Sequence, residues 1–224
     1  MSERGSGIPR LEAFSDGVFA IAITLLILEV KIPHVQEVDP GSLAPRLLHL
    51  WPSYGAYVLS FVMIGIYWAN HHYICRYFVR SDHAFNLLHV VFLMCISFIP
   101  FPTAILGQYV TQPGARRAAI AFYAFGMLLP AVAWLLIWLY ASRGHRLLEP
   151  NLDPGFVKRL TRQFIVSNLL YAGAVAVAFW WPLVSLVICV GLTLLYLLPP
   201  PLPPQSKVPG RKKGTVPFSA EVLD

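Results

Sequence analysis

The sequence predicts an all-α integral membrane protein with six transmembrane helices and with both termini in the cytoplasm. Three observations support this class. Of the 224 residues, 57% are apolar and only 12% are charged, whereas a soluble domain has about 25% charged residues. The mean hydropathy is +0.62. Uncharged stretches long enough to cross a bilayer recur along the chain. This composition excludes a disordered chain, a nucleic-acid-binding domain and a disulfide scaffold, and it argues against a soluble enzyme.

The first predicted helix spans about residues 11–32. Its uncharged part, 17–28, is short, and Ala20-Ile21-Ala22 resembles a signal-peptide cleavage site. The apolar run continues past that triplet, however, and Pro33 ends the helix. We therefore interpret this segment as a retained transmembrane helix.

The remaining five helices follow from the other uncharged stretches. They predict helices over about 47–70, 84–108 and 116–142. The stretch 163–206 is uncharged and about twice as long as one span requires. Because Trp favours the membrane interface and Pro lacks a helix donor, Trp180-Trp181-Pro182 predicts a turn between helices over about 156–179 and 183–198. Residues 1–198 thus make one transmembrane domain.

The distribution of Lys and Arg sets the orientation. With the N-terminus inside, only Lys31, Arg46, Arg116 and Arg117 face outward. The other thirteen of the 17 basic residues face the cytoplasm, as the positive-inside rule predicts. Residues 199–224 read as a proline-rich, basic cytoplasmic tail, which we interpret as disordered rather than bound to headgroups.

The cysteines and histidines give no metal-ligand pattern. Cys75, Cys95 and Cys189 are far apart in the sequence, and we interpret them as small buried hydrophobic residues. The adjacent His71 and His72 point in different directions on a helix, so they are poor joint ligands. A haem would need a facing histidine, for which His89 is a weak candidate. We expect no metal and no cofactor.

The first helix carries a narrow apolar stripe. At 100° per residue, Ile21, Leu25 and Leu28 share one face, and Phe14 continues it toward the cytoplasm. Thr24 lies at its flank, and Asp16 points away from it into the protein. Without further information, such a stripe faces lipid or a neighbouring helix.

The start of this helix also carries a motif. Arg10, Phe14, Ser15 and Asp16 form R-x-x-x-F-S-D, which resembles the signature of the transmembrane protein 175 family of potassium channels. Further similarity lies in 51–54, 67–72 and 99–103. The resemblance covers the first three helices, and the last three match in number and length only.

This resemblance implies a prokaryotic channel in the plasma membrane, with one six-helix unit per chain and four chains around a central pore. The first helix would line that pore in the lipid bilayer. Ile21 would form the hydrophobic gate, with Leu25 and Leu28 beside it, and Thr24 would contribute to cation selectivity for potassium. Alternatively, Thr24 bonds only the Ala20 carbonyl of its own helix.

The resemblance also implies a hydrogen-bonded structural network behind the pore. Ser15 and Asp16 would bond a histidine, His71 or His72, and Trp68 or Asn70, supported by Arg10 and Phe14. The sequence does not decide which histidine faces inward. Capping of the first helix is another role open to Asp16.

The predicted function is passive, potassium-preferring conduction of cations, with potassium as the permeant ion and no enzymatic activity. The alternative is a secondary transporter, possibly proton-coupled. No inverted repeat and no matching pair of broken helices supports it. An intramembrane enzyme would need a catalytic motif that the sequence lacks. A purely structural membrane subunit stays open.

Overall fold

The computed structural model describes residues 7–31 and 43–197. These residues contain no β-strand, which confirms the predicted all-α class. The elements are α1 (Gly7–Leu25), the 3-10 turn η1 (Leu26–Glu29), α2 (Leu43–His49), α3 (Trp51–Cys75), α4 (His83–Phe98), α5 (Pro100–Tyr109), α6 (Arg116–Ser142), η4 (Arg143–His145), α7 (Pro154–Ala178) and α8 (Pro182–Tyr196). The expected tail, 199–224, and the expected end of the first helix lie outside the described residues.

Within the described residues, four stretches of helix are long and apolar enough to cross a membrane. They are Gly7–Glu29, His83–Tyr109, Arg116–Ser142 and Pro154–Ala178. A fifth candidate is α2 with α3, which meet at an angle of 46°. The segment predicted as the sixth span contains α8, which has only 15 residues.

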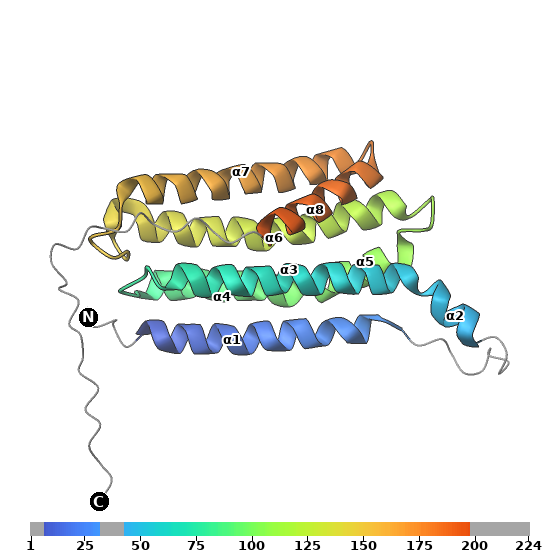
Figure 1. Ribbon diagram of the computed structural model, residues 1–224, viewed down its shortest axis with the longest axis horizontal. Helices are drawn as coiled ribbons and strands as arrows, with labels where there is room; N and C mark the ends of the chain where they lie inside the picture. The colour runs from blue at the N-terminus through green and yellow to red at the C-terminus, as the bar shows by residue number, and fades with distance from the viewer. Residues whose placement is uncertain (1–6, 32–42, 198–224) are drawn as a thin grey trace, which may run out of the picture.

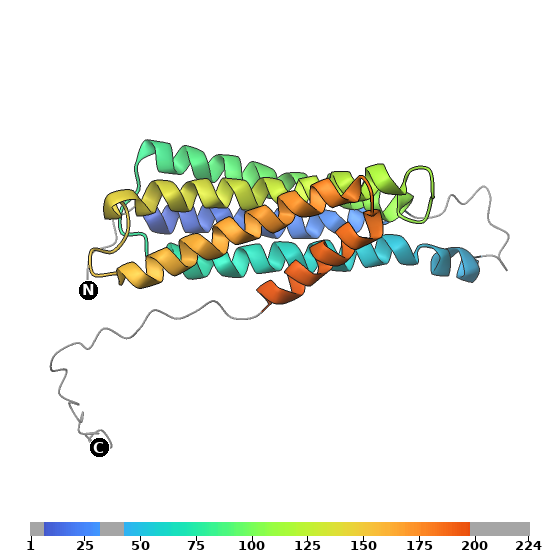
Figure 2. The same ribbon diagram turned by 90° about the horizontal axis from the view of Figure 1, so that it is seen from above.

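The long helices lie side by side and run alternately in opposite directions (Figure 1). On one side of the bundle α1 forms an outer layer, and it packs against α3 and α4. On the other side α6 packs against α4 and α7, and α8 folds back across α6 and α7 (Figure 2). Only 28% of the α1 span is buried, compared with 61% of the span formed by α4 and α5. The helix with the sequence motif therefore lies at the edge of the subunit.

Prolines and aspartates mark the starts of the helices. The Asp82 carboxylate accepts a hydrogen bond from the Phe85 amide at 2.9 Å and caps α4. Asp153 caps α7 in the same way. Proline occupies the first turn of α3, α5, α7 and α8, where a missing N–H costs nothing.

Three expected elements differ from the structure. The segment expected as one helix over 47–70 is divided at Leu50 between α2 and α3, and α3 continues to Cys75. The segment expected as one helix over 84–108 is divided at Ile99 into α4 and α5, because Pro100 and Pro102 lack the donors that an unbroken helix needs. The first helix changes from α to 3-10 geometry after Leu25. The angle of 100° per residue therefore no longer applies at Leu28.

One end of the bundle is held together by its loops. The Val79 amide donates to the Leu147 carbonyl, and the Glu149 amide donates to the Tyr77 carbonyl, each at 2.9 Å. These bonds join the loop between α3 and α4 to the loop between α6 and α7. Both loops lie at the end where α1 begins (Figure 1).

Candidate functional site

The outer helix α1 has a buried stripe that attaches it to the bundle. The buried residues are Ile8, Ser15, Phe19, Ala22 and Leu26. Their spacing of three, four and seven is that of a helix packed along one face. This buried stripe was not predicted from the sequence, although the spacing of its residues is visible there.

A second stripe on the same helix is left uncovered by the residues that the structure describes. Ile21 is 61% exposed and Leu28 is 71% exposed, with Phe14 and Leu25 also exposed. Leu28 remains exposed although it lies in the 3-10 turn rather than in the α-helix. An uncovered apolar row of this kind needs lipid, another subunit or a pore beside it.

Thr24 is exposed beside this stripe. Its hydroxyl lies 3.0 Å from the Ala20 carbonyl and 2.9 Å from the Ile21 carbonyl. The intrahelical bond considered from the sequence is therefore present. Because that bond uses the hydroxyl hydrogen, the oxygen keeps lone pairs that can face a cation.

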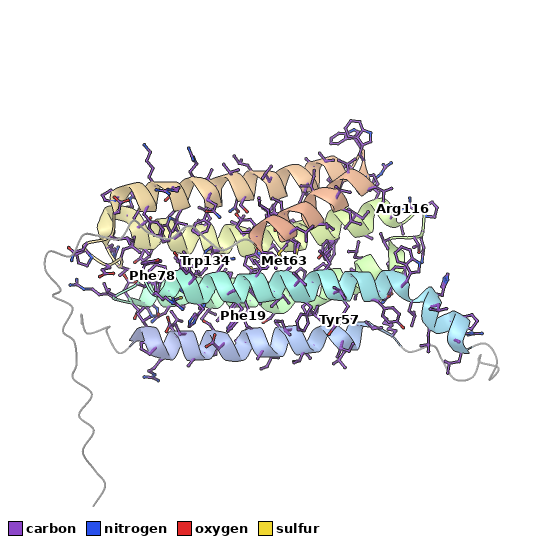
Figure 3. The ribbon with its side chains drawn as sticks, in the orientation of Figure 1. Phe19, Tyr57, Met63, Phe78, Arg116 and Trp134 are labelled. Atoms are coloured by element: carbon purple, nitrogen blue, oxygen red, sulfur yellow. The ribbon has the colours of Figure 1, made fainter. Side chains whose placement is uncertain are left out.

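An aromatic cluster stands behind α1. Phe19 of α1 lies 5.7 Å from the His71 ring and 6.0 Å from the Phe92 ring. His71 stacks on Phe92 with an interplanar angle of 2°, and Trp134 of α6 closes the cluster at 5.4 Å from His71. Figure 3 shows Phe19 and Trp134 directed into the bundle from opposite layers. The cluster joins α1, α3, α4 and α6.

The two histidines that the sequence did not distinguish have separate surroundings. His71 is 1% exposed and points into the aromatic cluster. His72 is exposed and stacks against Trp68 with ring centroids 6.3 Å apart. The inward histidine is therefore His71. The angle of 100° between consecutive helical residues explains why His72 does not share its surroundings.

The hydrogen-bonded network expected around Asp16 is smaller than predicted. Trp68 Nε1 donates to Asp16 at 2.9 Å, and this is the carboxylate's one bond within the described residues. The expectation that Ser15 joins it is wrong, because Ser15 lies on the buried stripe and donates to the Leu11 carbonyl at 2.8 Å. Asn70 similarly donates to the Ile66 carbonyl of its own helix.

Three further expectations about this network need correction. Asp16 is exposed in the subunit rather than turned into it. His71 does not bond Asp16, because it faces the core. Arg10 and Phe14 were expected to support the network, but both are exposed at the same end of α1. The contact between α1 and α3 thus combines aromatic packing with one indole–carboxylate bond.

Comparison with known proteins decides the family. The model of the endosomal/lysosomal potassium channel TMEM175 matches residues 10–100. A potassium channel of Chamaesiphon minutus is 42% identical over 189 residues, which cover 84% of this chain and 93% of that protein. A potassium channel of Streptomyces collinus is 41% identical over 80% of this chain and 84% of that protein. The chain belongs to the TMEM175 family. The resemblance drawn from its motifs is therefore confirmed.

A solved structure agrees with this assignment. The crystal structure of a lysosomal potassium-selective channel TMEM175 homolog from Chamaesiphon minutus matches with a TM-score of 0.78 at 39% identity. The match covers 87% of this chain and 98% of that one. The endosomal/lysosomal proton channel TMEM175 of Gallus gallus is 33% identical over 59% of this chain, but this covers only 28% of that protein. TMEM175 is a family of ion channels, and this chain is a multi-pass membrane protein.

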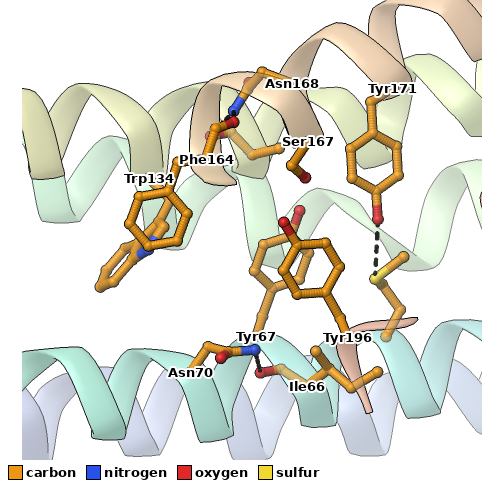
Figure 4. A pocket seen from close by; sticks show the side chains of 11 residues that line it. Ile66, Tyr67, Asn70, Trp134, Phe164, Ser167, Asn168, Tyr171 and Tyr196 are labelled. Atoms are coloured by element: carbon orange, nitrogen blue, oxygen red, sulfur yellow. Dashed lines mark hydrogen bonds between the residues drawn. The ribbon is translucent and has the colours of Figure 1, made fainter. Parts of the chain in front are cut away.

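A small, mainly apolar pocket with several polar groups lies inside this TMEM175 subunit, away from α1. It has a volume of about 50 Å³ and lies between α3, α6, α7 and α8 (Figure 4). Tyr67, Tyr171 and Tyr196 bring hydroxyl groups to it, and Asn168 Oδ1 has no partner within the described residues. This volume has room for water. The pocket is separate from the exposed stripe.

Proposed function

We propose that this TMEM175 chain forms a potassium-preferring cation channel. Four identical subunits surround a central pore, and α1 of each subunit lines it. Ions pass passively down their gradient, potassium is the permeant ion, and no cofactor takes part. The subunit crosses the plasma membrane of a prokaryote six times, with α8 as the sixth span and both termini in the cytoplasm.

The observation that carries this proposal is the pair of stripes on α1. The buried stripe attaches the helix to its own subunit through Phe19, and the exposed stripe presents Ile21 and Leu25 outward. A rigidly supported helix with a bare apolar face suits a pore lining better than it suits a subunit core. The bacterial relatives that are named potassium channels support the same function.

The proposed pore controls the passage of ions through the presence or absence of water at its narrowest ring. A ring of four Ile21 side chains offers no oxygen to an ion, so a narrow ring blocks ions by excluding water. Thr24 lies one turn further along and offers four hydroxyl oxygens at one level. We propose that the apolar ring forms the gate and that the hydroxyl ring favours potassium over sodium.

The substitution Ile21→Asn tests the proposal. An amide at the ring hydrogen-bonds water, so the pore stays wet and potassium flux increases severalfold. The flux is measured with the purified chain in liposomes under a potassium gradient alone. The parent chain, protein-free liposomes and Val90→Asn serve as controls, because Val90 of α4 is 52% exposed but lies off α1.

Two outcomes would contradict the proposal. If Ile21 faces lipid, asparagine there is costly, and the variant aggregates instead of conducting. If the chain is a proton-coupled transporter, an imposed proton gradient drives potassium flux without a potassium gradient, and a protonophore abolishes that flux. Potassium flux that needs a potassium gradient, is not driven by a proton gradient, and rises in Ile21→Asn but not in Val90→Asn supports the channel.

A further inference from the structure

Three residues that can bind a metal, two histidines and one cysteine, meet in the core behind α1, away from the proposed pore. His71 and Cys75 lie one turn apart on α3, and His89 faces them from α4. One ligand atom from each residue lies within 4.8 Å of the other two, and all three residues are buried. Residues from two helices thus converge on one point.

The histidine from α4 has an unused lone pair. His89 Nδ1 lies 3.0 Å from the Phe85 carbonyl, and because a carbonyl only accepts, Nδ1 must carry the hydrogen. The other nitrogen, Nε2, is therefore unprotonated in the neutral ring. It is fully buried and has no partner within the described residues. Metal-binding histidines are commonly held in this way, with one nitrogen donating to a carbonyl and the other facing the ion.

The separation between the Cys75 sulfur and a His71 nitrogen is that of two ligands on one three-coordinate ion. Cys75 Sγ lies 3.6 Å from His71 Nε2 and 3.8 Å from His71 Nδ1. Metal–nitrogen and metal–sulfur bonds of about 2.0–2.3 Å place such atoms about 3.7 Å apart in a trigonal arrangement. Because the sulfur lies almost equally far from both nitrogens of His71, the His71 ring has to turn to aim one lone pair at the ion. The ring nitrogen of His89, which lies within 4.8 Å of the other two ligand atoms, has to move closer.

The surroundings decide which cation fits. The rings of Phe92 and Trp134 lie 6.0 Å and 5.4 Å from His71 and offer no fourth ligand. The complex of a monovalent cation with one thiolate has no net charge. A divalent cation would leave a net positive charge in a low-dielectric core, which is costly. Thiolate and imidazole are ligands that monovalent copper accepts.

We propose that His71, Cys75 and His89 form a buried binding site for Cu⁺. Binding forms one copper–sulfur bond and two copper–nitrogen bonds, and it releases the proton of the thiol to solvent. Cys75 is the last residue of α3, so the ion enters from the end of the bundle that carries the loops. The bound ion cross-links α3 to α4 next to Phe19.

Competition for Cu⁺ tests the site in the purified full-length protein. The chain is titrated without oxygen against a coloured chelator of Cu⁺, and bound copper is counted. The expected result is one Cu⁺ per chain, with affinity reduced roughly 100-fold or more in Cys75→Ser and in His89→Phe. Cys189→Ser and His72→Gln are matched controls, because Cys189 is equally buried in α8 and His72 adjoins His71 on its exposed side.

The opposite results overturn the proposal. Equal Cu⁺ binding by the parent and by Cys75→Ser removes the site. A parallel titration with Zn²⁺ that shows zinc binding through Cys75, without copper binding, removes the copper assignment. If the variants do not fold, X-ray absorption of the copper-loaded parent replaces them. That spectrum must show one sulfur and two nitrogen neighbours, and a spectrum without sulfur contradicts the proposal.

Discussion

Thr24 illustrates how one side chain can serve both its helix and an ion. Its hydroxyl donates to the carbonyls of Ala20 and Ile21 within α1, which fixes the direction of the oxygen. A fixed oxygen is a better ion ligand than a rotating one, because no order has to be created when the ion arrives. The intrahelical bond is therefore compatible with a role in selectivity.

Removing this hydroxyl tests that role. Thr24→Val keeps the shape of the side chain but removes four oxygens from the proposed ring, so the preference for potassium over sodium falls while current remains. Reversal potentials measured with potassium on one side and sodium on the other show the change. Thr24→Ser keeps the oxygen and preserves the preference. An unchanged reversal potential in Thr24→Val would leave the hydroxyl with an intrahelical role only.

At the scale of the element, α1 divides its residues between attachment and exposure. Phe19 is 1% exposed, whereas Phe14 is 56% exposed on the same helix. The two residues have the same chemistry, so they form a matched pair. The difference between their environments is the difference between the two stripes.

Replacing each phenylalanine in turn with alanine tests whether the two stripes contribute differently to stability. Phe19→Ala leaves a cavity against His71 and Phe92, so it destabilises the subunit by about 3 kcal/mol. Phe14→Ala removes a ring that touches little of its own subunit, so the stability of the fold changes by much less. Unfolding in detergent, followed by the fluorescence of tryptophan, measures both. Equal losses in the two variants would contradict the division of α1 into two stripes.

The capping residue of α4 makes stability depend on pH. The amide of Phe85 holds the pKa of the Asp82 carboxyl below its usual value, helped by the Tyr140 hydroxyl at 2.8 Å and by Arg146 at 3.2 Å. Because the folded pKa is below the unfolded one, this stabilisation is complete at neutral pH. It is lost as the pH falls below about 4 and through the folded pKa.

Asp82→Asn tests this dependence. The amide oxygen still caps α4, but the charge that Arg146 meets is absent. We expect the variant to unfold at a lower temperature than the parent at neutral pH. The difference becomes smaller as the pH falls below about 4 and the parent carboxyl takes up its proton. If the difference between the two melting temperatures stays constant with pH, the ionisation of Asp82 does not contribute to the stability of the fold.

The elements also show what the sequence predicts and what it does not. Uncharged length and proline positions predicted the helical class and the turn before Pro182, since these depend on local chemistry. The common face of Ile21 and Leu25 follows from helical geometry, and their role in a pore stays a prediction. The orientation of His71 and the bond from Trp68 to Asp16 depend on how α1 and α3 pack, which no local pattern contains. Ser15 was assigned to the wrong partner for the same reason.

At the scale of the whole molecule, α1 is a boundary of the subunit. The other outer helix, α7, is buried to the same extent, 28%. The two outer faces are therefore alike in burial, and burial alone does not tell which one meets other subunits. The signature residues Arg10, Phe14 and Asp16 lie on α1, which favours α1 as the face at the centre of a symmetric assembly.

Chemical cross-linking distinguishes the two outer faces. In the proposed tetramer, Leu28 of every subunit lies near the central axis, so Leu28→Cys brings four thiols close together. A short bifunctional maleimide then joins subunits in pairs, and dimers dominate a denaturing gel. Leu169→Cys on α7 is the control, because Leu169 is 67% exposed against 71% for Leu28 but faces lipid in this arrangement, so its chains remain monomers. The native Cys75, Cys95 and Cys189 are buried and contribute little background. Cross-linking through Leu169→Cys but not through Leu28→Cys would place α7, and not α1, at the centre of the assembly.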